Sequence, residues 1–305
     1  MQKGLLLEPY TDMKGAYTCR RFLEEAKKQE IDLLMIGIAD CLLKDASVYF
    51  KGQDLDQMAP EFVINRYKFG MIKDKINALP SVKKSFNPID AFDRYINKGA
   101  EMEDLKELWT GRGEREAVLT FPETLLVHRL SDAEMILRSI KERIGFPVVM
   151  KGLTGSCGKE VTLLQDETEL EACLLQWKRS RSSEEERIFQ KFLFQTAGRD
   201  IRSLCVQGEV LASMIRKGPE GDFRSNVALG GTVEQIQPDQ VIKEAAARIY
   251  EITGLFCFGL DLLPAGSSYA FCEINVMPGL SGIEEASGKN LTGEILDRIR
   301  MELKK

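Results

Sequence analysis

The first third of the chain alternates short apolar runs with longer amphipathic stretches. Apolar runs of this length predict strands, and apolar positions that recur every three to four residues predict helices. The predicted strands are 3–8, 31–38 and 62–65, and the predicted helices are about 16–29 and a stretch that ends near Leu79. Because strands that alternate with helices are typical of a parallel sheet, we expect a small α/β unit here.

The rest of the chain changes pattern twice. A polar, helical connector at about 87–115 leads to a second region in which strands and helices alternate. Its predicted strands are 124–128, 146–151, 161–164 and 188–193, and its predicted helices are 131–145 and 166–178. After Gly198 we expect a hairpin that turns at Gln207-Gly208, a glycine-rich loop at 218–232, a helix at about 238–253, a second hairpin and a last helix from Leu291.

The second hairpin carries the most informative polar residues. Its two apolar runs flank a turn rich in Pro, Gly and Ser. Asp261 and Glu273 lie about equally far from the turn, so we expect them to face each other, with Asn275 on the same face as Glu273. Carboxylate and amide oxygens favour a hard cation, so these residues predict a site for Mg²⁺ or Mn²⁺. The alternative is a set of solvated polar residues on an edge hairpin.

Composition and charge narrow the class of protein. The chain of 305 residues has a formal net charge of -5, which argues against a general nucleic-acid binder. It contains no apolar stretch long enough to predict a transmembrane helix, and its first residues turn polar too early for a signal peptide. An odd number of cysteines, 7, without a Cys-x-x-Cys spacing, favours free thiols in a reducing cytoplasm.

A glycine-rich loop follows the predicted strand 146–151. Lys151 ends that strand, and the glycines that follow it allow backbone N–H groups to approach phosphate oxygens. The spacing is not that of a P-loop, and the loop leads into a strand rather than a helix. The loop therefore predicts a phosphate-binding site, with a flexible hairpin loop as the alternative.

The strand 188–193 offers a candidate surface for a nucleotide base. Its free edge can hydrogen-bond an adenine ring, while Phe192 and Leu193 pack nearby. The alternative is an ordinary strand of the core.

Arginines gather in the first hairpin and in the loop that follows it. Asp200 and Arg202 share one strand face, and we expect Arg216 to lie close to them across the hairpin, with Arg224 in the loop. Arginines that converge beside a carboxylate-bound metal favour phosphoryl chemistry. The alternative is ion pairing at the surface.

In this order, the motifs resemble the ATP-grasp superfamily, and within it the RimK-type glutamate ligases. The resemblance is close over about 117–303 and holds only in outline before that. The matching segments are 146–151 with its loop, 198–202, 220–226, 259–261, 273–275 and 278–284. The resemblance implies an α/β architecture of the α+β ATP-grasp type. Its implied parts are a pre-grasp domain with connector at 1–116, a central subdomain at 117–195, and a C-terminal subdomain with the metal site at 196–305.

The same resemblance implies a place for each candidate residue around ATP. The residues implied to hold the nucleotide are Lys98, Lys151, Gly155, Ser156, Gly158, Gln190, Lys191, Phe192, Leu193, Asp200, Arg202, Arg224, Ser225 and Asn226. Two Mg²⁺ or Mn²⁺ ions would be bound by Asp261, Glu273 and Asn275, and the catalytic arginines would be Arg216 and Arg224. Lys98 is the candidate for the connector lysine that reaches the α-phosphate.

The implied reaction is a two-step ligation. A carboxylate of a small molecule or peptide attacks the γ-phosphate of ATP to give an acyl phosphate, and an amine then displaces phosphate to give an amide. The protein's part is positioning and charge neutralisation. The resemblance implies no membrane or nucleic-acid partner, and it leaves the acid, the amine and any homo-oligomer open.

Two positions depart from the family pattern. Lys191 stands where the family usually has glutamate, and a lysine cannot accept a hydrogen bond from an adenine amino group. Leu229 stands where RimK-type chains tend to carry a basic residue, which favours a less acidic or more apolar acceptor. Two alternatives to a ligase stay open: a kinase that phosphorylates a hydroxyl, and a nucleotide-binding module without turnover.

Overall fold

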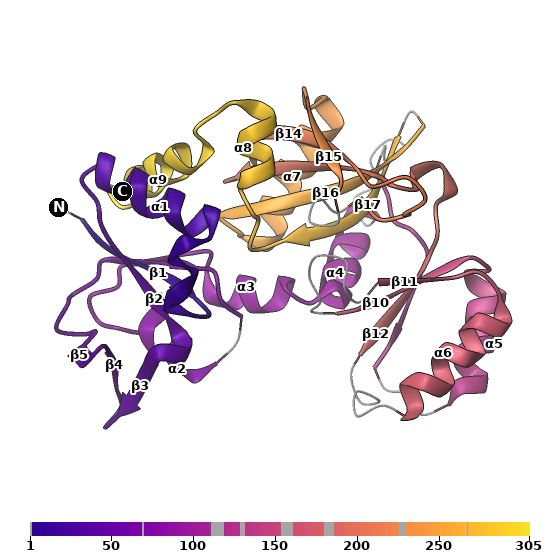
Figure 1. The fold of residues 1–305 in the computed structure, drawn as a ribbon, viewed down its shortest axis with the longest axis horizontal. Coiled ribbons are helices and arrows are strands. Elements are labelled where there is room, and N and C mark those ends of the chain that lie inside the picture. Colours follow the sequence, from indigo (N-terminus) through magenta and orange to yellow (C-terminus); the bar gives the residue numbers. More distant parts are fainter. Residues whose placement is uncertain are drawn as a thin grey trace.

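The structure is a computed structural model that describes residues 2–68, 70–110, 119–128, 132–153, 161–179, 186–225, 230–266 and 268–305. Within these ranges the strands form four sheets. Figure 1 shows the N-terminal sheet at one end of the molecule, the central sheet at the other, and the largest sheet between them. No helix in the described ranges is long and apolar enough to cross a membrane.

A parallel sheet forms the N-terminal unit, which confirms the predicted α/β pattern. Its strand order is β2 (Asp32–Gly37), β1 (Lys3–Glu8), β6 (Phe62–Asn65) and β7 (Lys84–Phe86). Its helices are α1 (Tyr17–Lys28) and α2 (Met71–Asn77). Leu6 packs in one core cluster with Phe22 of α1, whereas Leu5 and Leu7 pack in another with Ile76 of α2. The alternating side chains of β1 therefore bury both faces of the sheet.

A small antiparallel sheet that the hydrophobic pattern does not predict extends the N-terminal unit. Its strands are β3 (Cys41–Lys44), β4 (Ser47–Phe50) and β5 (Gln53–Asp54). Val48 and Phe50 reach the same core cluster as Leu5.

Two helices make the connector. They are α3 (Ile89–Tyr95) and α4 (Lys98–Thr110). Asn97 begins α4, since its side-chain oxygen accepts hydrogen bonds from Gly99 N at 2.8 Å and Ala100 N at 3.2 Å. The N–H of Lys98 donates to the carbonyl of Leu153 at 3.1 Å, which ties the start of α4 to the central sheet.

The central sheet is antiparallel and its helices cover one face. Its order is β11 (Val161–Leu164), β10 (Val148–Gly152), β12 (Arg187–Lys191) and β9 (Thr124–Val127), and its helices are α5 (Ala133–Arg143) and α6 (Glu167–Arg179). Figure 1 shows α5 and α6 together on one side of this sheet. Phe189 packs with Ile140 of α5 and Trp177 of α6 in one core cluster. Asp166 caps α6 as predicted, because its carboxylate accepts from Glu169 N at 3.0 Å.

The largest sheet contains both predicted hairpins. Its order is β15 (Thr232–Ile236), β14 (Glu209–Lys217), β13 (Arg199–Val206), β16 (Cys257–Ala265), β17 (Ser268–Asn275) and β8 (Leu119–Thr120). Helix α7 (Gln240–Thr253) packs its apolar side against this sheet, where Ile249 and Phe258 share a core cluster. The edge strands β15 and β8 are not predicted from the sequence.

The last two helices return to the N-terminal unit. Helix α8 (Ser281–Ser287), also not predicted, precedes α9 (Leu291–Glu302), which lies beside α1 (Figure 1). Phe22 of α1 and Ile295 of α9 share a core cluster. Helices α1 and α9, near the two ends of the chain, are thus packed together. The pocket described next lies between the largest sheet and the central sheet.

Candidate active site

A pocket lies where the connector, the central sheet and the largest sheet meet. Its lining residues are Lys98 of α4; Val149, Lys151 and Gly152 of β10; Val161 of β11; Gln190 and Lys191 of β12; Phe192, Leu193 and Thr196; Arg199, Asp200 and Arg216 of β13 and β14; Phe223, Arg224 and Ser225; and Asp261, Leu263, Cys272 and Glu273 of β16 and β17. Most of the candidate residues that the structure describes therefore come together in one place.

The two carboxylates of the second hairpin face each other. Asp261 of β16 pairs directly with Glu273 of β17, which confirms the predicted register. The register shifts just after Asp261, so one extra residue is accommodated beside the pair. Asp261 is only 1% exposed, and Glu273 is more open to the pocket.

Alternating charges connect three strands beneath the pocket. Arg216 donates from Nε to Asp200 at 2.6 Å and from Nη2 to Asp261 at 2.7 Å. Arg202 donates from Nε to the other oxygen of Asp261 at 2.7 Å. We call these four residues the charge ladder: Asp200, Arg216, Asp261 and Arg202. Burial alone would raise the pKa of the Asp261 carboxyl, but the guanidinium groups of Arg202 and Arg216 outweigh it and lower that pKa to about 2.

Asp200 lines the pocket, but its carboxylate is held by the ladder. Both of its oxygens accept from Arg216, and Ser225 also hydrogen-bonds its carboxyl. With 5% of its surface exposed, Asp200 orients Arg216.

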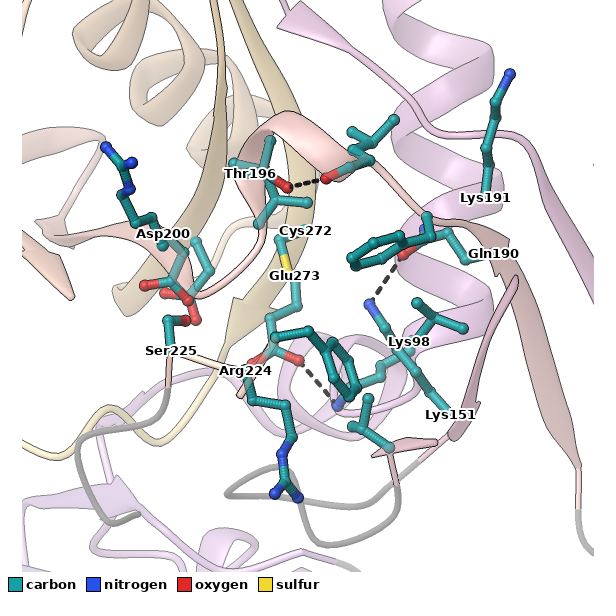
Figure 2. A pocket seen from close by; sticks show the side chains of 18 of the residues that line it. Lys98, Lys151, Gln190, Lys191, Thr196, Asp200, Arg224, Ser225, Cys272 and Glu273 are labelled. Atoms are coloured by element: carbon teal, nitrogen blue, oxygen red, sulfur yellow. Dashed lines mark hydrogen bonds and ion pairs between the residues drawn. The ribbon is translucent and has the colours of Figure 1, made fainter. Parts of the chain in front are cut away.

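Two lysines reach the pocket from different elements. The ammonium of Lys98 lies 3.2 Å from Glu273 Oε2, and Lys151 donates to Gln190 Oε1 at 2.8 Å (Figure 2). Burial would lower the pKa of Lys98, but the carboxylates of Glu273 and Glu101 outweigh it and raise that pKa. Lys98 is therefore a cation in the pocket.

One side of the pocket is apolar. Phe192 makes an edge contact with Phe223, with ring centroids 6.0 Å apart, and Val149, Val161 and Leu263 also line the cavity. Figure 2 shows the side chain of Lys191 extending away from Gln190, and Lys191 is exposed. Only Phe192 and Leu193 of this apolar surface are named from the sequence. Phe223 and Val149 carry no distinguishing signal, because apolar residues in strands and loops most often belong to the core.

Some candidate residues lie outside the pocket lining. Arg202 contacts the pocket residues Asp261 and, at 3.9 Å, Glu273, and Asn275 accepts a hydrogen bond from Met277 N at 2.9 Å. Arg224 lines the pocket and pairs with Asp222 at 2.8 Å. The predicted residues Gly155, Ser156, Gly158 and Asn226, together with Leu229, lie outside the described residues.

The oxygen donors of the second hairpin are of the type that a hard cation binds. Two of the three, Asp261 and Glu273, line the pocket. Asp261 and Glu273 supply carboxylate oxygens at one end of the pocket, and Asn275 stands opposite Gly259, next to this pair on the hairpin. In the structure these carboxylates are paired with Arg202, Arg216 and Lys98, and within the described ranges no three Asp, Glu, His or Cys residues cluster as metal ligands.

Comparisons with known proteins agree with this arrangement. A RimK-like ATP-grasp domain matches residues 113–299. A probable alpha-L-glutamate ligase of Halorhodospira halophila is 28% identical over 295 residues, which is 94% of this chain and 92% of that protein. The ATP-grasp ligase PsnB, in a complex with a minimal precursor, Mg and ADP, has 17% sequence identity and a TM-score of 0.68 over 99% of this chain and 97% of that one.

A third similarity concerns the fold alone. The D-alanine–D-alanine ligase of Bacillus anthracis, in complex with ATP, gives a TM-score of 0.67 at 15% identity and covers 99% of each chain. The matched domain spans more than half of the sequence and includes the central sheet, the charge ladder and the second hairpin. The chain belongs to the RimK-like ATP-grasp family and is an ATP-dependent carboxylate–amine ligase similar to the alpha-L-glutamate ligases.

Proposed function

We propose that this protein adds an amino acid to a small molecule or peptide through an acyl-phosphate intermediate, with ATP bound in the pocket between the central and the largest sheets. One observation carries the proposal. Lys98, Lys151, Asp261 and Glu273 come from four separate elements, and all four line one pocket that also has an apolar side. Cations, carboxylates and an apolar surface are what a metal-bound nucleoside triphosphate requires.

The adenine would occupy the apolar side. Phe192, Phe223 and Leu193 give a ring a surface on which to pack, and the end of β12 supplies backbone groups for its polar edge. The exposed Lys191 side chain is not needed there. Its departure from the family pattern is therefore compatible with ATP binding.

The phosphates would extend from the adenine toward the lysines. Lys151 is the last residue but one of β10, just before the glycine-rich loop, and Lys98 approaches from the connector. Both ammonium groups neutralise phosphate oxygens as point charges. We assign the loop residues Gly155, Ser156 and Gly158 to the same task on the basis of the sequence.

The hairpin carboxylates would hold the metal. Asp261 and Glu273, with Asn275, would hold two Mg²⁺ ions, which would supply positive charge that neutralises the phosphates. PsnB binds Mg and ADP in its complex, which supports this choice of cation.

Arginine would complete the site. Arg216 is fixed by Asp200 and Asp261 with its guanidinium at the floor of the pocket, so little reorganisation is needed to stabilise a negatively charged phosphoryl group beside it. Arg224, Ser225 and Asn226 would approach the same group from the loop. No side chain acts as a covalent nucleophile, and Cys272 remains a thiol whose pKa burial raises to about 12.

The domain division implied by the resemblance is part of the proposal. The sheets support boundaries at 1–116, 117–195 and 196–305, with one exception: β8 at Leu119–Thr120 joins the largest sheet instead of the central one. Six free cysteines in the described ranges support a reducing cytoplasm as the place of the reaction.

The experiment that tests the function is an ADP-release assay with ATP and Mg²⁺. Amino acids, dipeptides and glutamate-terminated peptides would be supplied singly and in pairs, and the products would be weighed by mass spectrometry. We expect ADP release that requires both a carboxylate and an amine, with a product mass equal to condensation. A phosphorylated product that needs no amine would instead identify a kinase. ATP binding without turnover on any pair would overturn the ligase proposal for these substrate classes.

A further inference from the structure

We propose that Glu101, a buried glutamate of the connector helix, is a positioning residue that fixes Glu273 relative to Lys98 in the ATP pocket. This inference rests on the proposed function, because it concerns how the same pocket is held together. Glu101 does not line the pocket, and its sequence context is that of an ordinary polar helix.

The first argument is burial. Glu101 is only 1% exposed, whereas glutamates are almost never buried without a partner. Within the part of the chain that the structure describes, the Glu101 carboxyl accepts a hydrogen bond from a backbone group. The N–H of Ile274 donates to its Oε2 at 3.0 Å. Burying a carboxyl costs free energy, whereas an exposed glutamate would only solvate the helix. The burial of Glu101 against a strand backbone therefore indicates a structural task for its carboxyl.

The second argument is where Ile274 lies. It follows Glu273 directly on β17, and the outer edge of β17 is paired with β8 only at Tyr269 and Ala270. Beyond those residues the edge faces α4, and Ile274 shares a core cluster with Met102 of that helix. The Glu101 carboxyl therefore takes the place of a neighbouring strand at the position next to Glu273.

The third argument is the spacing on α4. Lys98 and Glu101 are three residues apart, so they lie on one face of the helix. Lys98 contacts the side chain of Glu273 at 3.2 Å, and Glu101 contacts the backbone of the next residue at 3.0 Å. One helical turn thus holds both the carboxylate and the strand that carries it.

The proposal predicts that the length of the side chain at position 101 matters more than its charge. If Glu101 acts by holding the Ile274 N–H, a side chain of the same length with an acceptor oxygen will replace it, and a shorter side chain will not. Glutamine keeps the length and the acceptor without the charge, whereas aspartate keeps the charge but is one methylene too short. The pair E101Q and E101D separates the two accounts.

The test is ATP binding in the presence of Mg²⁺, measured by isothermal titration calorimetry on the full chain. We expect E101Q to bind ATP within about twofold of the unchanged protein and E101D to bind roughly tenfold more weakly, the equivalent of about one hydrogen bond. The exposed Glu103 on the same helix gives a matched control, E103D, with unchanged affinity. Affinities of E101Q and E101D in the reverse order, or two variants equal to the unchanged protein, would overturn the proposal.

A double-mutant cycle separates positioning from a merely structural role. If Glu101 acts through Lys98 and Glu273, the loss caused by E101D shrinks to less than about twofold in a K98M background. A loss of the same size in both backgrounds would show that Glu101 acts elsewhere. Failure of the unchanged protein to bind ATP would instead contradict the proposed function, so the two failures are distinguishable.

Discussion

Asp261 and Glu273 are cross-strand neighbours, yet their surroundings give them different tasks. Asp261 is buried between two guanidinium groups, whereas Glu273 has 26% of its side chain exposed and contacts Lys98. The Asp261 carboxylate is thus held in buried ion pairs within the sheet. The Glu273 carboxylate is exposed enough to leave Lys98 and bind another cation. Removal of each should have a different signature.

Replacement of Asp261 by alanine should lower stability in addition to removing a proposed metal ligand. The substitution leaves Arg202 and Arg216 without their shared carboxylate, and breaking a buried ion pair in this way costs about 3–5 kcal/mol. Urea unfolding of D261A would measure the loss. D222A is the matched control, because Asp222 pairs with Arg224 nearer the surface and its loss should cost under about 1 kcal/mol. Equal losses in both variants would contradict the role given to the ladder.

Replacement of Glu273 by glutamine should act mainly on turnover. The variant keeps the shape of the side chain but loses the charge that would hold the metal, so we expect ADP release to fall roughly 100-fold or more. Its thermal unfolding should stay close to that of the unchanged protein, because the side chain is partly exposed. Normal turnover in E273Q would show that Glu273 does not bind the metal.

Residues of this pocket differ in how far the sequence predicts them. Asp261 and Glu273 are visible because charged residues interrupt apolar strands symmetrically about a turn. The ladder is only half visible: the sequence places Arg216 near Asp200, but it does not show that Arg216 also bonds Asp261, since that contact depends on the order of strands in the sheet. The sequence does not predict the role of Glu101, because a polar residue in a polar helix gives no sign that it is buried.

At the scale of elements, helices α1, α8 and α9 are joined by one charged network. Arg21 donates to Glu25 at 2.8 Å, to Glu284 at 3.2 Å and to Asn290 at 2.7 Å. Burial would raise the pKa of Glu25, but bonds from Lys28, Asn290 and Arg21 outweigh it and lower that pKa to about 2. The network therefore depends on ionised carboxylates.

The pH dependence of this network is predictable. Because the pKa of Glu25 is lower in the folded protein than its ordinary value of 4.5, its contribution is complete above about pH 4.5 and is lost as the pH falls toward 2. We expect E25Q to lower the free energy of unfolding at pH 7, and the difference from the unchanged protein to shrink at pH 3. Urea unfolding at both pH values would test this. A difference that grows in acid would contradict it.

Long periodic elements are predicted well and short ones are not. The hairpin register around Asp261 follows from two apolar runs of similar length, and the helix at about 238–253 follows from its period; both are confirmed. Strands β3, β5 and β8 have between two and four residues, so their existence depends on partners that the local sequence does not name. Helix α8 is one short segment of seven residues with the same difficulty.

At the scale of the whole molecule, the pocket joins the central sheet to the largest sheet. A ligand that binds across them stabilises the folded chain by mass action, by about 2.7 kcal/mol at 100 times its dissociation constant. We expect ATP with Mg²⁺ to raise the thermal unfolding temperature, and EDTA to remove most of that gain. AMP is a suitable control, since it lacks the phosphates that would reach Lys98 and the metal. An increase that EDTA leaves unchanged would contradict the proposed metal.

The charge ladder has a consequence for how a polyanion is drawn in. Its two arginines and two aspartates sum to zero, so the floor of the pocket carries no net charge even though it is densely ionic. At the walls, Lys98 is balanced by Glu273, whereas Lys151 donates to the neutral Gln190 and supplies positive charge that is not part of this cancellation. Ionic strength screens exposed charges more than buried pairs. Salt should therefore weaken the capture of ATP through the walls while leaving the floor, and with it the shape of the site, unaffected.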